Sequence, residues 1–539
     1  MTSTTNNRNW LPVFAAISFV IFIWLNWFPP GGIDEQMTAE STEVISKSEA
    51  AVVAEDFITS LYDVDELETM VTFNSYQNEN GYFLREDVFD LYEATWKLSV
   101  PIDYYEVFTR DMNRKLDFRV HLQMNDGRIF GWEILNPTEY TGSAQKGITK
   151  QGILNDLGYS NEDFTLASRN SDKEYVHRQL IGDASLRLKL IQQGDLITGF
   201  MPIFELPQSY TTWKDHQDFL GEVWSLISLL LWFGLAIAAV VYLAIYRKTM
   251  SFGRGVLLTL AFVIPYLIHN VNMYPGYMLM VDGASDGAVG MALFSQFLMM
   301  LMGITVYLTL VAGDGMWNRM DWHLWPTPKE QDYGSMIMRS MGNGYLICVI
   351  VLGFQSFLFF IAGKLFDIWA TSDPLTSTHN LLAPEYYPLL AWSAAISEEA
   401  VFRMFGIVFF VYIIRSICNG LFRVTGWLFL QKTIIHLIPA VVLSNMIWAL
   451  GHTGYSIYPV YTRFIEVTLL GFIFAYAFLR YGLITAIFAH ASMDIIIMGM
   501  QIMMGDASHV LLGLTYMLMP ALVAWLISYL WRWRTARSR

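Results

Sequence analysis

The stretch Glu398-Glu399-Ala400-Val401-Phe402-Arg403 places three ionisable side chains inside an apolar run of this 539-residue chain. The residues on both sides, 394–396 and 404–414, are apolar. A charged side chain at the centre of a membrane helix costs at least ~2.5–3.5 kcal/mol. We therefore expect the charges of this cluster to be paired or used in function.

Spacing divides the cluster into a pair and a single acid. Glu399 and Arg403 are four positions apart with the acid first, so they share a helix face and can neutralise each other. Glu398 points elsewhere and has no local partner. An unpaired carboxylic acid in a membrane helix is a candidate functional group.

The composition also indicates a membrane protein. Hydrophobic residues make up 54% of the chain and charged residues only 15%, against about 25% in soluble domains. Residues 31–220 hold 33 of the 48 acidic and 16 of the 34 basic residues, so this segment carries a net charge of −17 and the remainder +3. No basic tract indicates nucleic-acid binding. Both cysteines, Cys348 and Cys418, lie outside the acidic segment, which excludes a disulfide framework there.

Ten apolar stretches approach the roughly 20 residues needed to cross a bilayer. The first is interpreted as an uncleaved signal anchor, because residues 29–32, Pro-Pro-Gly-Gly, offer no small-residue cleavage site. The predicted spans are 10–28, 221–246, 255–273, 288–312, 343–365, 388–414, 433–452, 463–480, 482–503 and 510–531.

Basic residues fall in alternate connections between these spans. Arginines and lysines lie after the second, fourth, sixth and tenth spans and Arg480 ends the eighth, whereas 274–287 and 504–509 contain acids and no bases. The positive-inside rule then predicts that both termini are cytoplasmic and that residues 31–220 lie outside. We expect a polytopic α-helical membrane protein of about ten spans in a bacterial cell membrane, with an inserted α+β extracytoplasmic domain.

The outer segment shows a faint internal repeat. Residues 57–66 resemble residues 153–162, and each is followed by alternating residues with a turn, at 118–134 and 186–205. Asp126-Gly127 between alternating runs is a strong hairpin signal. We predict two helix-plus-hairpin units that bind a partner, shield or sense.

Two later apolar helices carry further polar groups. Trp448 and His452 are spaced i,i+4, as are His490 and Asp494, so each pair shares a helix face. Three helices thus present ionisable groups at membrane depth, which is what a site in the core of a bundle requires.

The order of these motifs, E-E-x-x-x-R, then aromatic-x-x-x-H, then H-x-x-x-N/D, resembles the CAAX protease and bacteriocin-processing (CPBP, or Abi) family of intramembrane proteases. The resemblance covers about residues 385–503. It implies hydrolysis of a peptide bond in a membrane-associated protein or peptide, with Glu398 and His452 activating a water. His490 and Asp494 would stabilise the oxyanion, and Glu399 with Arg403 would hold Glu398 in place.

Two positions depart from the family pattern. Trp448 stands where Phe is usual, and Asp494 stands where Asn is frequent. An ionised aspartate cannot donate to an oxyanion. Asp494 must therefore be protonated, orient His490 through its ring N–H, or coordinate a metal.

The last of these options defines a metal hypothesis. Glu398, His452, His490 and Asp494 supply two imidazoles and two carboxylates, an acceptable set for a catalytic zinc. The zinc-protease motif H-E-x-x-H is absent. We expect a metal-free glutamate mechanism and keep zinc as the alternative.

The predicted organisation is a signal-anchor span at 1–30, the acidic outer domain at 31–220, transmembrane helices at 221–380, CPBP-like catalytic helices at 381–503 and a last span with a basic tail at 504–539. The expected partners are the lipid bilayer, a membrane-associated substrate and a partner of the outer domain. Two other classes stay open: a non-catalytic adaptor or immunity protein that keeps the family fold, and a transporter. The spans show no internal repeat of the kind that transporters carry.

Overall fold

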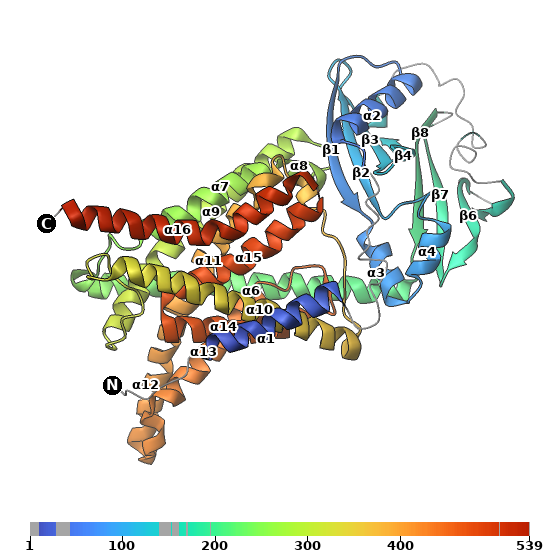
Figure 1. Cartoon of the computed structure of the whole chain (residues 1–539). Helices are drawn as coiled ribbons and strands as arrows, with labels where there is room; N and C mark the ends of the chain where they lie inside the picture. The colour runs from blue at the N-terminus through green and yellow to red at the C-terminus, as the bar shows by residue number, and fades with distance from the viewer. Residues whose placement is uncertain are drawn as a thin grey trace.

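The computed structural model describes residues 10–28, 44–139, 152, 161–168, 171–193, 196–505 and 507–537. These residues form a bundle of long helices with a β-sheet domain at one end (Figure 1). The last helix of the chain runs away from the sheet, so the described C-terminal end lies at the opposite end of the bundle. Each of the two parts has its own hydrophobic core.

The sheet domain is one eight-stranded antiparallel sheet with the order β1-β2-β3-β4-β8-β7-β6-β5. Two four-stranded meanders meet through their last strands, where Trp132 of β4 pairs with Phe200 of β8. The strands are β1 (Leu67–Ser75), β2 (Asp103–Asp111), β3 (Leu116–Gln123), β4 (Ile129–Ile134), β5 (Phe164–Ser168), β6 (Ser171–Ile181), β7 (Ala184–Gln193) and β8 (Leu196–Glu205).

Both predicted hairpins are present in this sheet. β3 pairs with β4 around Asp126-Gly127, and β7 pairs with β8. Helix α2 (Lys47–Leu61) packs through Ala50, Ala54 and Ile58, which are spaced i,i+4 and fully buried. The helix predicted for the second unit falls on residues 153–160, which lie outside the described residues. The repeat is thus visible in the strands alone.

The bundle is built from helices of very different length. Two short helices, α3 (Gln77–Arg85) and α4 (Phe89–Thr95), belong to the sheet domain. The bundle contains α1 (Leu11–Trp27), α6 (Gln208–Tyr246), α7 (Val256–Asn272), α8 (Tyr274–Met280), α9 (Ser285–Asn318), α10 (Tyr333–Phe366), α11 (Leu390–Glu398), α12 (Val408–Thr425), α13 (Thr433–Leu450), α14 (Val460–Tyr481), α15 (Leu483–Gly505) and α16 (Val510–Arg537).

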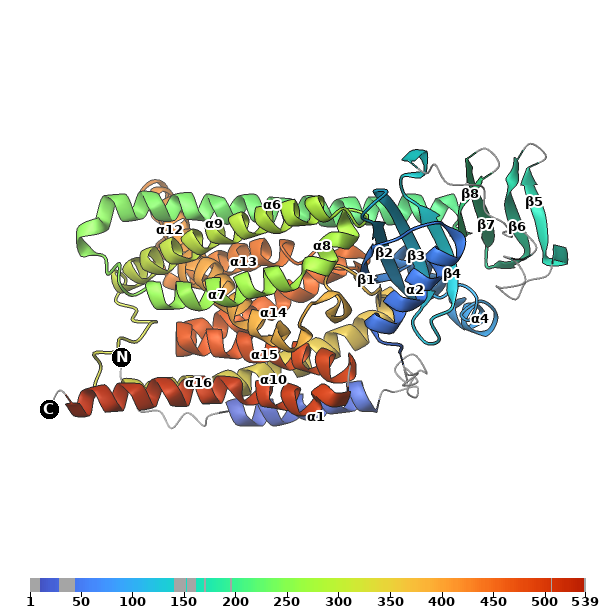
Figure 2. The same cartoon turned by 90° about the horizontal axis from the view of Figure 1, so that it is seen from above.

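Helix α6 joins the two parts without a break. It starts at Gln208, immediately after β8, and continues through the bundle for 39 residues (Figure 2). The boundary predicted at residue 220 therefore falls inside a continuous helix. The prediction placed the boundary where the apolar run begins, whereas the helix begins twelve residues earlier.

The structure gives fewer spans than the ten predicted. Among the described residues, eight helical segments are long and apolar enough to cross a membrane, or up to nine if α7 and α8, bent by 54°, count as one. Helix α1 has 17 residues, which at 1.5 Å per residue is about 25 Å, shorter than a ~30 Å hydrocarbon core. The full count of ten stays a prediction.

The segment predicted as one span at 388–414 is longer and irregular. Helix α11 passes at Glu399 into a π-helix, Glu399–Ile407, and then into α12, so that the helical segment runs from Pro384 to Thr425. The end of α12 and the start of α13 project from the bundle as a helical hairpin (Figure 1).

The chain between α10 and α11 ties the sheet domain to the bundle. Asn380, which is fully buried, accepts from the backbone N–H of Phe73 at 2.7 Å and donates to its carbonyl at 2.7 Å. These two hydrogen bonds attach the edge strand β1 to the segment that contains Asn380. Earlier in the same segment, β9 (Trp369–Ala370) pairs with β10 (Ile457–Tyr458), the strand that follows His452. The sheet domain is thus fixed over the end of the bundle where α11 begins.

Candidate active site

The Glu-Glu-Arg motif lies where the helix widens from α to π geometry. Glu398 is the last residue of α11 and Glu399 the first of the π-helix. Two neighbouring helices supply side-chain donors to carbonyls of the widened turns: Ser444 to Phe402 at 2.6 Å and Trp317 to Met404 at 2.8 Å. π-Helical turns inside α-helices frequently occur at functional sites. Here the interruption begins directly at the two glutamates of the motif.

Glu399 and Arg403 are buried completely, with no exposed side-chain surface. The Arg403 Nη1 lies 3.5 Å from Glu399 Oε1, so the ion pair predicted from the spacing is present. The guanidinium also lies over the ring of Trp448, 4.0 Å from its centroid. A cation over an indole face is attracted by the ring quadrupole, and more so away from water. The second motif therefore holds the arginine of the first.

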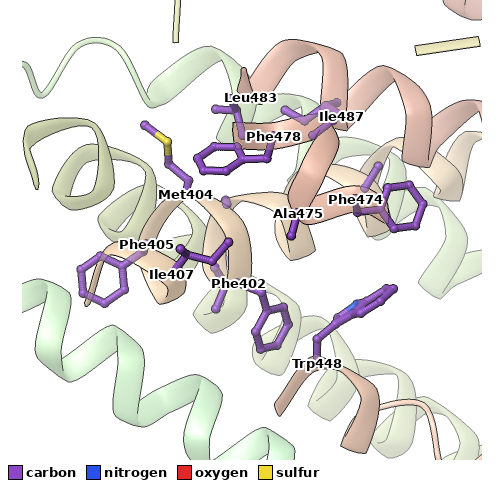
Figure 3. Close-up of a cluster of buried hydrophobic side chains, with 14 of the residues drawn as sticks. Phe402, Met404, Phe405, Ile407, Trp448, Phe474, Ala475, Phe478, Leu483 and Ile487 are labelled. Carbon is purple, nitrogen blue, oxygen red and sulfur yellow. The ribbon is translucent and has the colours of Figure 1, made fainter. Parts of the chain in front are cut away.

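Arg403 lies against the rings of Trp448 and Phe474. Figure 3 shows these two rings in a cluster of buried hydrophobic side chains, together with Phe402, contributed by α13, α14 and the π-helix. All three are at most 3% exposed. They exclude water from Glu399 and Arg403, which makes the pairing of these charges necessary.

Glu398 lies at the meeting point of the three motifs. The indole N–H of Trp448 donates to its Oε2. His452 Nε2 is 3.8 Å from Oε1, and His490 Nε2 is 3.6 Å from Oε2. These separations exceed a normal hydrogen bond and suit a bridging water. The Glu398 side chain is 18% exposed, so this acid, unlike Glu399, is open to an incoming molecule.

Both histidines are oriented through their Nδ1 atoms. His452, just beyond the end of α13, has Nδ1 3.0 Å from the carbonyl of Trp448. His490 in α15 has Nδ1 3.0 Å from Glu399 Oε1. With a proton on each Nδ1, which carbonyl and carboxylate acceptors favour, both rings turn Nε2 toward Glu398.

The contact between Glu399 and His490 was not predicted. Sequence spacing assigned Glu399 to Arg403 alone, because the two are on one helix, whereas His490 is 91 residues away. The structure gives Glu399 both partners. Glu399 therefore contacts a residue of the third motif as well as the arginine of its own motif.

Asp494 lies on the same face of α15 as His490, and its Oδ2 is 3.7 Å from His490 Nε2. The six predicted residues, Glu398, Glu399, Arg403, His452, His490 and Asp494, are thus brought together from four helical segments. Among the described residues, however, no group of three or more His, Cys, Asp and Glu is arranged to hold a metal ion. We derive no step through a metal.

A second polar cluster beside the site escaped the sequence analysis. Arg463 and Glu466, three apart at the start of α14, form an ion pair at 2.5 Å, and Gln355 of α10 donates to Glu466 at 2.8 Å. The Arg463 guanidinium lies 5.2 Å from the ring of Tyr455, which stacks on His452. The signal was present as an i,i+3 pair, but the predicted span started at 463 and placed this pair at the water boundary.

Comparison with known proteins agrees with the motifs. Residues 383–496 match the model of one protein family, described as Type II CAAX prenyl endopeptidase Rce1-like. The match spans about a fifth of the chain and contains all six site residues. No curated protein and no solved structure matched the chain. The residues from 383 to 496 therefore form a Rce1-like domain of the type II CAAX prenyl endopeptidases, consistent with a protease of the CPBP/Abi family.

Proposed function

We propose that the protein is an intramembrane endopeptidase that hydrolyses a peptide bond of a membrane-associated protein or peptide. The observation that carries the proposal is the convergence of Glu398, His452 and His490 from three helices, with N···O separations of 3.6 and 3.8 Å. The Rce1-like match supports a protease of this family. The roles that we propose for single residues rest on their geometry together with this match.

Glu398 acts as the general base. A water held between its carboxylate and His452 Nε2 loses a proton to Glu398 as its oxygen attacks the peptide carbonyl. A positioned base contributes typically 10²–10⁴-fold. The hydrogen bond from the Trp448 indole fixes the carboxylate, so that little reorientation is needed when the substrate arrives.

His490 faces the same space from the opposite side. Carboxylate oxygens lie at both of its ring nitrogens, Glu399 at Nδ1 and Asp494 at Nε2. They favour a ring that donates from both nitrogens. The Nε2–H then stabilises the oxyanion of the tetrahedral intermediate, while Glu399 orients the ring through Nδ1. The negative charge of Asp494 beside the ring favours the charged imidazole, so the aspartate itself need not donate. Glu398 returns its proton to the leaving amine.

The arrangement of charges supports one orientation in the membrane. Arg247 and Lys248, Arg319, and the arginines of the C-terminal helix lie at the end of the bundle away from the sheet domain. The positive-inside rule then puts that end in the cytoplasm and the sheet domain outside. The sheet domain at that end of the bundle would limit the access of substrates to Glu398.

The test is a comparison of membrane proteomes and released peptide fragments between cells with the wild-type protein and with Glu398→Gln. Glu222→Gln is the matched control, because Glu222 is an exposed acid of α6. We expect a fragment that is missing with Glu398→Gln alone. A cellular role that survives this substitution unchanged would indicate the adaptor function instead.

A further inference from the structure

A groove that is lined by none of the six candidate catalytic residues is open over part of its length. It has a volume of about 740 Å³ and lies between α1, α10 and α14. Helix α1 packs along α10 (Figures 1 and 2), and at Gly353 the two backbones approach so closely that an added Cβ would lie 2.2 Å from the carbonyl oxygen of Ser18. The groove is thus bounded by a fixed helix pair.

The two ends of the groove differ in chemistry. Apolar side chains such as Phe357 and Ile473 line the end nearer the sheet domain. Asn343, Tyr476 and Arg480 line the other end. The lining holds one charged residue, Arg480, and no acid.

Arg480 has no carboxylate partner within the described part of the chain. Its interaction there is with the face of the Tyr481 ring, 5.6 Å from the centroid. Trp10 and Tyr476 line the groove near it. Tryptophan and tyrosine concentrate at the level of lipid headgroups, so this end lies at the membrane surface, where an unpaired arginine meets headgroups.

The length of the groove matches a lipid chain. From Asn343 to Phe357 the floor helix α10 rises about 21 Å at 1.5 Å per residue. One leaflet contributes about half of a ~30 Å hydrocarbon core. An acyl chain that enters beside Arg480 therefore stays in contact with the groove for the full depth of its leaflet.

We propose that this groove is a binding site for a phospholipid with an anionic headgroup, with one acyl chain along α10 and the headgroup on Arg480. Basic positions between helices near a membrane surface recognise such headgroups. The site is separate from the catalytic centre. Helix α14 borders both, because Ile473 lines the groove while the next residue, Phe474, stacks on His490 at 4.5 Å.

The test uses the full-length protein in nanodiscs with equal amounts of phosphatidylglycerol and phosphatidylcholine, followed by gentle release and native mass spectrometry of the retained lipid. We expect the wild type to retain phosphatidylglycerol about fivefold over phosphatidylcholine, the factor that one basic residue near the surface supplies. Arg480→Gln should bring this ratio close to one, and Arg480→Lys should keep it. Arg423→Gln, at an exposed arginine of α12 outside the groove, should leave it unchanged.

Ile473→Trp tests the groove without touching the arginine. The larger side chain fills the apolar part, so the total retained lipid should fall at least twofold. Equal retention of the two lipids by the wild type would overturn the proposal, as would a ratio in Arg480→Gln equal to that of the wild type. An unchanged lipid count in Ile473→Trp would also contradict it.

Discussion

Removing the charge of Glu399 tests whether this residue is the central brace of the site. Its Oε1 is 3.5 Å from Arg403 Nη1 and 3.0 Å from His490 Nδ1, and all of its surface is buried. Glu399→Gln leaves the arginine charged in an apolar wall. Breaking a buried ion pair from one side costs about 3–5 kcal/mol, because the remaining charge is uncompensated.

The double variant Glu399→Gln/Arg403→Met separates this electrostatic cost from lost packing. Methionine fills much of the space of the arginine and makes favourable contacts with aromatic rings, here those of Trp448 and Phe474. Replacing both members of a buried pair is often neutral. We therefore expect the double variant to recover most of the stability that the single substitution loses.

The assay is reversible unfolding of the purified protein in mixed micelles, followed by tryptophan fluorescence. Glu222→Gln serves as control and should stay within about 0.5 kcal/mol of the wild type, as exposed substitutions do. Two results would refute the reasoning. One is a Glu399→Gln protein as stable as the control, and the other is a double variant no more stable than the single one.

The remaining predictions concern catalysis and pH. Glu398→Gln should lower peptide-bond hydrolysis by at least about 100-fold. The unfolding transition should stay in place, because the Glu398 side chain is 18% exposed whereas that of Glu399 is completely buried; a folded variant with full activity would exclude Glu398 as the base. Trp448→Phe keeps an aromatic ring over Arg403 but removes the hydrogen-bond donor to Glu398. Hydrogen bonds to charged groups contribute about 1.5–3 kcal/mol, so we expect kcat to fall roughly tenfold or more. Wild-type kinetics of this variant would contradict the prediction. Treatment with strong chelators should leave activity intact, and loss of activity that zinc restores would favour the metal hypothesis. Burial raises the pKa of Glu79 in the sheet domain from 4.5 to about 7. Between these pH values the folded state binds more protons than the unfolded state, so the free energy of unfolding should fall as pH rises from about 4.5 to 7, by up to about 3 kcal/mol. Thermal unfolding of Glu79→Gln should lack this pH dependence.

The candidate site illustrates how far spacing along a helix can be taken. Pairs on one helix, such as Glu399 with Arg403 and His490 with Asp494, follow from the helical repeat, and the structure places both pairs within 3.7 Å. The order of the three motifs also indicated the family that residues 383–496 match. What spacing could not give is any contact between helices.

The contacts that distinguish the two glutamates are all contacts between different helices. The Glu399–His490 hydrogen bond and the indole donor on Glu398 join helices 91 and 50 residues apart. They depend on how α11, α13 and α15 pack together, which the spacing within one helix does not specify. The sequence also missed the Arg463–Glu466 pair, since hydropathy alone sets no sharp membrane boundary.

By itself, the sequence determined that the chain is a helical membrane protein with a separate acidic domain and three polar motifs, because composition, apolar run length and helical spacing are local properties. Three further features came only from the tertiary structure. Helix α6 joins the two parts without a break, and Asn380 is hydrogen-bonded to β1. Glu398 faces two histidines, whereas Glu399 is buried. These features arise from packing between segments far apart in the chain. Their energies depend on burial and distance, which exist only once the helices have come together.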